Sequence, residues 1–144
     1  MATTNTYLTF DGNCEEAFNF YKSVFGGEFT YLGRFDSIPD SPEFIVPEKD
    51  KNKIMHVSLP IGKSILMGSD TSCGNPTPVI QGNNFSISII ADSQAEADDL
   101  FAKLAAGGTV IMPIEDMFWG DYFGMVLDQF GIQWMVNFSR DGQY

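Results

Sequence analysis

Cysteine, histidine and basic residues are all scarce in this chain of 144 residues. The two cysteines, Cys14 and Cys73, lie outside any C-x-x-C or C-x-x-H pattern, so they indicate neither a disulfide framework nor a zinc site. With 8 Lys and Arg against 19 Asp and Glu, the formal net charge is −11. So acidic a surface repels phosphate backbones and anionic lipids, which proteins bind mainly through Lys and Arg. We therefore expect no nucleic acid and no membrane among its partners.

Long apolar stretches are also missing. No run of about 18 apolar residues occurs, which excludes a membrane-spanning helix. The residues from Met1 to Tyr7 lack the basic and apolar segments of a signal peptide. A cytoplasmic protein with reduced thiols is therefore expected. Hydrophobic residues nevertheless make up 44% of the chain and include 13 Phe, enough to build the core of one globular domain.

One segment of the first half of the chain recurs in the second half. Residues 10–27 read F-D-G-N-C-E-E-A-F-N-F-Y-K-S-V-F-G-G, and residues 91–108 read A-D-S-Q-A-E-A-D-D-L-F-A-K-L-A-A-G-G. In both, a strand-like run precedes an Asp, apolar residues follow at helical spacing, and a Gly-Gly pair suits the end of a helix. A second similarity joins Ile61–Met67 to Phe130–Val136. The sequence thus predicts two copies of one folding unit.

Each copy is predicted to be a βαβββ unit, which makes the fold class α+β. Helices are expected at 13–25 and 93–106, and strands at 5–10, 28–35, 54–60, 63–68, 84–91, 109–115, 122–128 and 132–138. The polar, proline-bearing stretch 36–53 is predicted to be a surface loop. We interpret residues 1–144 as one domain with modules at 1–70 and 84–140 and a linker at 71–83.

The tandem βαβββ pattern, with Asp128-Gln-Phe-Gly131 before the last strand, resembles the vicinal oxygen chelate superfamily, which includes glyoxalase I, bleomycin-resistance proteins and extradiol dioxygenases. The runs 7–27 and 117–135 resemble its PhnB-type branch, the proteins labelled 3-demethylubiquinone methyltransferase-like. This resemblance implies tandem βαβββ repeats whose mixed sheets curl into a half-open cup. It also implies a homodimer. Because no G-x-G-x-x-G motif or P-loop is present, we expect no cofactor.

Alternation along the strands sorts residues onto two faces. Met55, Val57 and Leu59 form one apolar face, so His56 and Ser58 point the other way. Each strand has one apolar face for its helix and one mixed face, and the mixed faces have the composition of a small-molecule pocket. An ordinary solvated sheet face is the alternative. The candidate ligand-binding residues are Tyr7, Thr9, Arg34, His56, Ser58, Ser86, Ser88, Trp119, Gln133 and Met135.

In metal-dependent members of the superfamily, four positions that face the cup supply His, Glu or Gln ligands. When those four positions are transferred to this sequence, they fall on Asn5, Leu66, Ser86 and Met135. These residues offer neither the imidazoles nor the carboxylates that a divalent zinc, nickel or iron ion requires. A shift of one residue does not change this result. The sequence therefore predicts a protein that binds no metal.

The lone histidine, His56, is a candidate general base or hydrogen-bond partner of a ligand, and a bonded structural residue is the alternative. Tyr7 and Asp121 are the other catalytic candidates. Trp119 and Asp121 belong to an aromatic loop that would either border a ligand or fill a gap between the modules. Arg34 would meet an anionic ligand or form a surface salt bridge. Cys14 lies in the first helix and is expected to be buried and inert, whereas Cys73 is expected to be exposed.

Two classes of function remain open. The favoured interpretation is a cytoplasmic, metal-independent protein that binds a small, partly aromatic or polar molecule as a homodimer. The alternative is an enzyme, such as a lyase, an isomerase or a dioxygenase-like protein, that uses His56, Tyr7 or Asp121, or an unrecognised metal site. A purely structural interaction module is a third possibility.

Overall fold

Two compact units, Met1–Ile80 and Gln81–Tyr144, make up the chain. The computed structural model describes residues 1–39, 41, 45–71 and 78–140. The division between the units falls inside the predicted linker 71–83. Cys73 lies outside the described residues. No helix in the described part of the chain has the length and hydropathy needed to cross a membrane.

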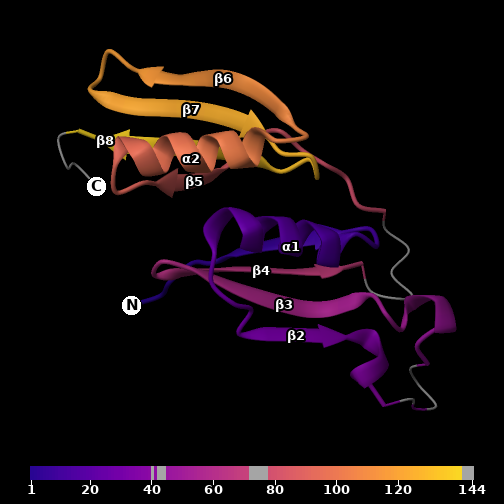
Figure 1. The fold of residues 1–144 in the computed structure, drawn as a ribbon. Helices are drawn as coiled ribbons and strands as arrows, with labels where there is room; N and C mark the ends of the chain where they lie inside the picture. Colours follow the sequence, from indigo (N-terminus) through magenta and orange to yellow (C-terminus); the bar gives the residue numbers. More distant parts are fainter. Residues whose placement is uncertain (40, 42–44, 72–77, 141–144) are drawn as a thin grey trace. The chain divides into compact units, whose positions relative to one another are not determined.

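The first unit contains one four-stranded mixed sheet with one α-helix on one face (Figure 1). Its strands are β1 (Thr6–Phe10), β2 (Tyr31–Arg34), β3 (Ile54–Ile61) and β4 (Ser64–Asp70), and its helix is α1 (Cys14–Phe25). Two short 3-10 turns, η1 (Phe35–Ser37) and η2 (Glu48–Asp50), lie between β2 and β3. The strand order is β1-β4-β3-β2, in which β1 and β4 are parallel and the other pairs are antiparallel.

The second unit repeats this plan. Its strands are β5 (Ile87–Ile90), β6 (Thr109–Asp116), β7 (Asp121–Leu127) and β8 (Gln133–Ser139), and its helix is α2 (Gln94–Ala105). The order β5-β8-β7-β6 matches that of the first unit, and β5 and β8 are again the parallel pair. The prediction of two βαβββ copies in an α+β fold is therefore confirmed.

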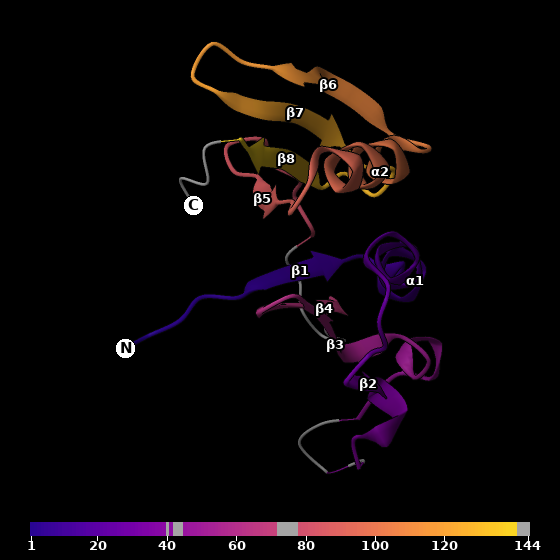
Figure 2. The same cartoon turned by 60° about the vertical axis from the view of Figure 1, so that its left-hand side comes forward.

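Each helix covers one face of the sheet in its own unit, and Figure 2 shows α1 nearly along its axis. In the first unit the covered face carries Leu8, Val57 and Leu59, each at most 5% exposed, and α1 contributes the fully buried Phe18. In the second unit Trp134, Val126 and Leu104 are fully buried in the same way. The opposite face of each sheet, which we call the open face, is where a site can form.

Two strands, β2 and β5, are each four residues shorter than predicted, and β3 contains a bulge. β2 begins at Tyr31 because two glycines with positive φ, Gly26 and Gly27, turn the chain after α1. β5 spans only Ile87–Ile90 of the predicted 84–91. In β3 the register slips, so that Gly33 pairs with His56 but Arg34 pairs with Ile54. Met55 is therefore only half-buried, and Ile54 takes its expected place in the core.

The two helices begin in different ways. Ser93 caps α2 locally by accepting a hydrogen bond from the Glu96 amide at 3.1 Å, and the Glu96 side chain accepts from the Asp92 amide at 3.0 Å. The residue before α1, Asn13, makes no such side-chain bond. The buried carboxylate of Asp70, at the end of β4, accepts from the Cys14 amide instead, at 2.9 Å. The start of α1 is therefore fastened to the sheet by a residue distant in sequence.

Candidate functional site

The open face of the first sheet brings together side chains from three strands around His56. Pairing places Tyr7 opposite Met67, Met67 opposite Ser58, and Ser58 opposite Tyr31. The rings of Tyr7 and Tyr31 each lie 5.7 Å from the imidazole of His56, centroid to centroid. Thr9 also lies on this face and is exposed. Of the predicted site residues, the structure thus gathers Tyr7, Thr9, His56 and Ser58 in one unit.

Both ring nitrogens of His56 have hydroxyl groups nearby. The Tyr7 hydroxyl lies 3.4 Å from Nδ1, and the Ser58 hydroxyl lies 3.0 Å from Nε2. A neutral imidazole protonated on Nε2 would accept a hydrogen bond from the Tyr7 hydroxyl at Nδ1 and donate one from Nε2 to the Ser58 oxygen. The result is a chain of hydroxyl, imidazole and hydroxyl that ends at the exposed Tyr7 side chain. Such a chain can bind a polar ligand group or move a proton.

Tyr31 completes this cluster, although the sequence reasoning did not select it. The expected strand was longer, and nothing in the local pattern showed that Tyr31 would pair with Ser58. Its ring folds back over Gly33, where an added Cβ would lie 2.6 Å from the Tyr31 hydroxyl. A side chain at Gly33 would therefore push the Tyr31 ring away from His56. The sequence feature that could have indicated this packing is Gly33, the small residue that pairs with His56.

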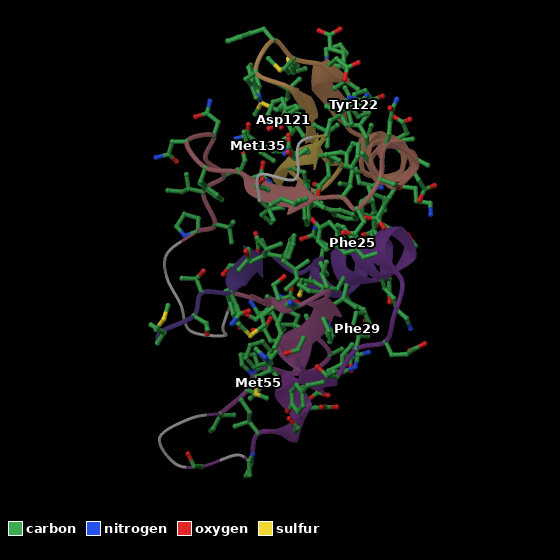
Figure 3. The ribbon with its side chains drawn as sticks, turned by 90° about the vertical axis from the view of Figure 1, so that its left-hand side faces the viewer. Phe25, Phe29, Met55, Asp121, Tyr122 and Met135 are labelled. Atoms are coloured by element: carbon green, nitrogen blue, oxygen red, sulfur yellow. The ribbon has the colours of Figure 1, made fainter. Side chains whose placement is uncertain are left out.

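The open face of the second sheet is more apolar. Ser88 pairs with Met135, Met135 with Met125, and Met125 with Met112, so a row of methionines crosses the sheet. Figure 3 shows Met135 on the side of this sheet away from α2, whereas Tyr122 lies toward α2 and donates a hydrogen bond to Asp98. Two further predicted residues of this unit lie at the starts of strands: Ser86 precedes β5, and Gln133 is the first residue of β8. Ser86 is half-buried, and Gln133 donates to the Phe85 carbonyl at 3.3 Å.

The aromatic loop between β6 and β7 lies beside this open face. Trp119 is 50% exposed, and its ring centroid lies 6.1 Å from that of Phe123, a residue of β7 that shares the face with Met125. Asp121 opens β7 and is buried, and its backbone carbonyl accepts from the Met117 amide at 2.8 Å. Asp121 therefore belongs to the second unit, whereas the two other catalytic candidates, Tyr7 and His56, belong to the first.

Arg34 does not lie on the open face. It pairs with the buried Ile54, and its guanidinium donates to both carboxylate oxygens of Glu15 at 3.0 and 2.6 Å and to the Asn52 carbonyl at 2.9 Å. This ion pair holds the pKa of Glu15 below its usual range, mainly through the hydrogen bond. The salt bridge, rather than the anion-binding role, is the alternative that the contacts support.

One of the four supposed chelating positions is assigned wrongly from sequence. Leu66 is 3% exposed and pairs with Leu59 on the helix-covered face, so the residue that faces outward is Met67. The error arises because the β3–β4 turn contains only Gly62 and Lys63, whereas the β7–β8 connection runs over residues 128–132. Equal spacing after the glycine therefore does not give equal orientation.

The corrected set of positions is Asn5, Met67, Ser86 and Met135. Asn5 uses its side-chain oxygen to accept from the Ile65 amide at 3.1 Å, which extends the pairing of β1 and β4. Two thioethers, one amide and one hydroxyl do not fit a hard or borderline divalent ion. Across the described residues, no three His, Cys, Asp or Glu side chains converge on one point. The residues at these positions therefore do not suit the metal chemistry of the enzymes that this chain resembles.

Cys14 is fully buried at the start of α1. Burial, together with the negative charge of Asp70 and then that of Glu15, raises the pKa of its thiol well above the usual range. A thiol in this state is a poor nucleophile at neutral pH. The contacts therefore agree with the inert role expected for Cys14.

Comparisons with known proteins agree on the type of fold. A family model described as the Glyoxalase/Bleomycin resistance protein/Dioxygenase superfamily matches residues 3–136. The Escherichia coli protein YjdN is 30% identical over 137 residues, which cover 91% of each chain. The Pseudomonas aeruginosa protein PA1353 superposes with a TM-score of 0.83 and 40% identity, over 96% of this chain and 98% of that one. The PhnB protein of Bacillus cereus shares the fold, with a TM-score of 0.73 and 24% identity over 96% and 100% of the two chains.

Proposed function

Because the chain belongs to the glyoxalase/bleomycin resistance/dioxygenase superfamily, we propose that it is a metal-independent small-molecule-binding protein. The proposed ligand lies against the open face of a sheet. In this proposal the protein works without a cofactor, as a homodimer in the cytoplasm. The resemblance to the superfamily supplies the expectation of a dimer, which sedimentation velocity would test.

The observation that carries this proposal is the contrast between the two faces of each sheet. One face is filled by a helix, and the other presents aromatic, hydroxyl and thioether groups without a set of metal ligands. On the first sheet Tyr7, Tyr31 and His56 offer flat rings and hydrogen-bonding groups at 5.7 Å spacing. On the second sheet Met125, Met135 and Phe123 offer flexible apolar contacts. This mixture suits a small organic molecule.

Metal dependence gives the first test of the proposal. We expect purified protein to contain no stoichiometric transition metal, as measured by elemental mass spectrometry. We also expect its thermal midpoint to be unchanged by Zn²⁺, Ni²⁺, Mn²⁺ or EDTA, because an ion stabilises only a native state that binds it. Native mass spectrometry of the same sample should reveal a bound organic molecule. Stoichiometric metal, with a midpoint that falls on chelation, would refute the proposal.

A metal-free enzyme is the second candidate, and the contacts of His56 favour it specifically. The hydroxyls at 3.4 and 3.0 Å from its two nitrogens form a route along which a proton could pass from Tyr7. The test compares wild type with the variants His56→Gln and Tyr7→Phe on whatever molecule copurifies. If the protein only binds, the molecule is recovered unchanged and its affinity falls by about tenfold or less in either variant. Chemical conversion by wild type that both variants abolish would establish the enzyme instead.

A further inference from the structure

Asn137, near the end of β8, is a buried polar residue whose side chain has no hydrogen-bond partner among the described residues. Its exposed fraction is 4%, and within the described part of the chain neither its amide nitrogen nor its amide oxygen makes a hydrogen bond. Its backbone carbonyl is satisfied, since it accepts from the Ala91 amide at 2.8 Å. The unmet hydrogen-bonding capacity therefore belongs to the carboxamide alone.

The register places this carboxamide on the open face of the second sheet. Asn137 pairs with Phe123 on β7 and with Ile90 on β5, and it stands two residues from Met135 on the same strand. Trp119 contacts Phe123 at the loop. Phe123, Ile90 and Met135, its neighbours by register, therefore offer this carboxamide almost no hydrogen bonds.

Burying an unpaired carboxamide destabilises a fold, whereas an apolar residue of similar size would pack here without that cost. A buried amide among apolar neighbours therefore indicates a partner from outside the chain. The methionine side chains beside it are flexible enough to move aside and admit one. The carboxamide presents a donor and an acceptor side by side in one plane, so its best partner presents an acceptor and a donor in the same way.

The charges around Asn137 narrow the range of ligand groups that it could bind. The four strands of this sheet contain no Lys, Arg or His, and the charged residues on its open face, Asp121 and Glu115, are both acidic. An anionic ligand would be repelled from this face and would leave the carboxamide oxygen without a donor. A neutral amide or lactam satisfies both atoms.

We propose that Asn137 recognises a neutral amide or lactam group of the ligand, whose apolar or aromatic body packs against Phe123 and Met135. This inference rests on the proposed binding function and names the chemical class that the site accepts. The carboxamide fixes the orientation of the ligand, while the methionines and rings contribute non-directional contact area.

A matched set of probes tests this proposal on the full chain. The probes are 2-quinolinone, which is an aromatic lactam, its N-methyl derivative, which lacks the donor, and 2-naphthoate, an anion of similar size. Isothermal titration should show that wild type prefers 2-quinolinone to either of the others by about tenfold or more. Asn137→Leu should remove that preference and remain folded, because it removes both unpaired groups and leaves an apolar side chain of similar volume.

Asn19→Leu, on the exposed side of α1, is the control and should bind the probes like wild type. Asn137→Asp provides a second variant, which should lose the lactam preference because it adds charge and removes the donor. Equal binding of the three probes by wild type, or a lactam preference that survives in Asn137→Leu, would overturn this inference and leave the binding function in place. Failure of wild type to bind 2-quinolinone would also overturn the inference, and the copurification test would then judge the binding function separately.

Discussion

Replacing Asp128 by Ala is expected to lower the free energy of unfolding by about 3 kcal/mol or more, because hydrogen bonds to a charged group contribute about 1.5–3 kcal/mol each and their loss leaves buried donors unpaired. Asp128 is 3% exposed. Its carboxylate accepts hydrogen bonds from the Phe130 amide at 2.8 Å, the Ile132 amide at 3.0 Å and the indole nitrogen of Trp134 at 2.8 Å. Removing the carboxylate leaves three donors without this acceptor, and the indole N–H belongs to a fully buried ring.

The loss should extend to the binding face, because this connection sets the start of β8. Trp134 points into the core and Met135, the next residue, points to the open face, so the register of one fixes the orientation of the other. Loosening the connection at residues 128–132 therefore loosens Met135 and Asn137 as well. Ligand affinity should fall together with stability.

Urea unfolding, followed by circular dichroism, measures the effect on stability. Asp99→Ala is the matched control, because Asp99 forms an exposed ion pair with Lys103 at 2.9 Å within α2, and we expect it to cost less than about 0.5 kcal/mol. If Asp128→Ala were no less stable than Asp99→Ala, the carboxylate would not be the group that holds this connection.

The sequence predicted the repeated architecture because its evidence is local. Helical spacing, the Gly-Gly ends and strand alternation are properties of neighbouring residues, and both helices begin and end within one residue of the predicted positions. The strands are less accurate, because their lengths depend on which partner they meet. β2 and β5 are shorter than predicted, since pairing with β3 and β8 decides where each strand begins.

Orientation was the part of the candidate site that local patterns could not determine. Tyr7, His56 and Ser58 were selected by alternation and do lie together. Arg34 and Leu66 were not assigned to the correct face, the first because of the bulge in β3 and the second because the two turns differ in length. A shift of one residue reverses the face of every following side chain in a strand. The unpaired carboxamide of Asn137 is visible only in three dimensions, among the residues that the structure describes.

Replacing Asp70 by Ala is expected to destabilise the chain by about 3–4 kcal/mol, since it removes a buried carboxylate that binds three backbone amides. The acceptor atoms of Asp70 lie 3.0 Å from the Gly12 amide, 2.9 Å from the Cys14 amide and 2.8 Å from the Ile54 amide. Asp70 thereby joins the start of α1 to the start of β3. Asp70→Asn should lose only about half as much stability as Asp70→Ala. The amide oxygen of Asn can still accept the two hydrogen bonds at the start of α1, while its amide nitrogen faces the Ile54 amide.

Cys14 supplies a local measurement that separates this mechanism from general destabilisation. In wild type the thiol is buried and the charge of Asp70 raises its pKa, so it should react with an aromatic disulfide reagent only when the start of α1 opens. The measurement uses a Cys73→Ser background, which leaves Cys14 as the single thiol. Asp70→Ala should increase the labelling rate of Cys14 by about tenfold or more, because opening the start of α1 then requires less free energy and the thiolate forms at lower pH. Asp11→Ala, at an exposed carboxylate in the same turn, should leave the rate nearly unchanged. Equal labelling rates in Asp70→Ala and Asp11→Ala would mean that α1 is held to its sheet by packing alone, without the cap from β4.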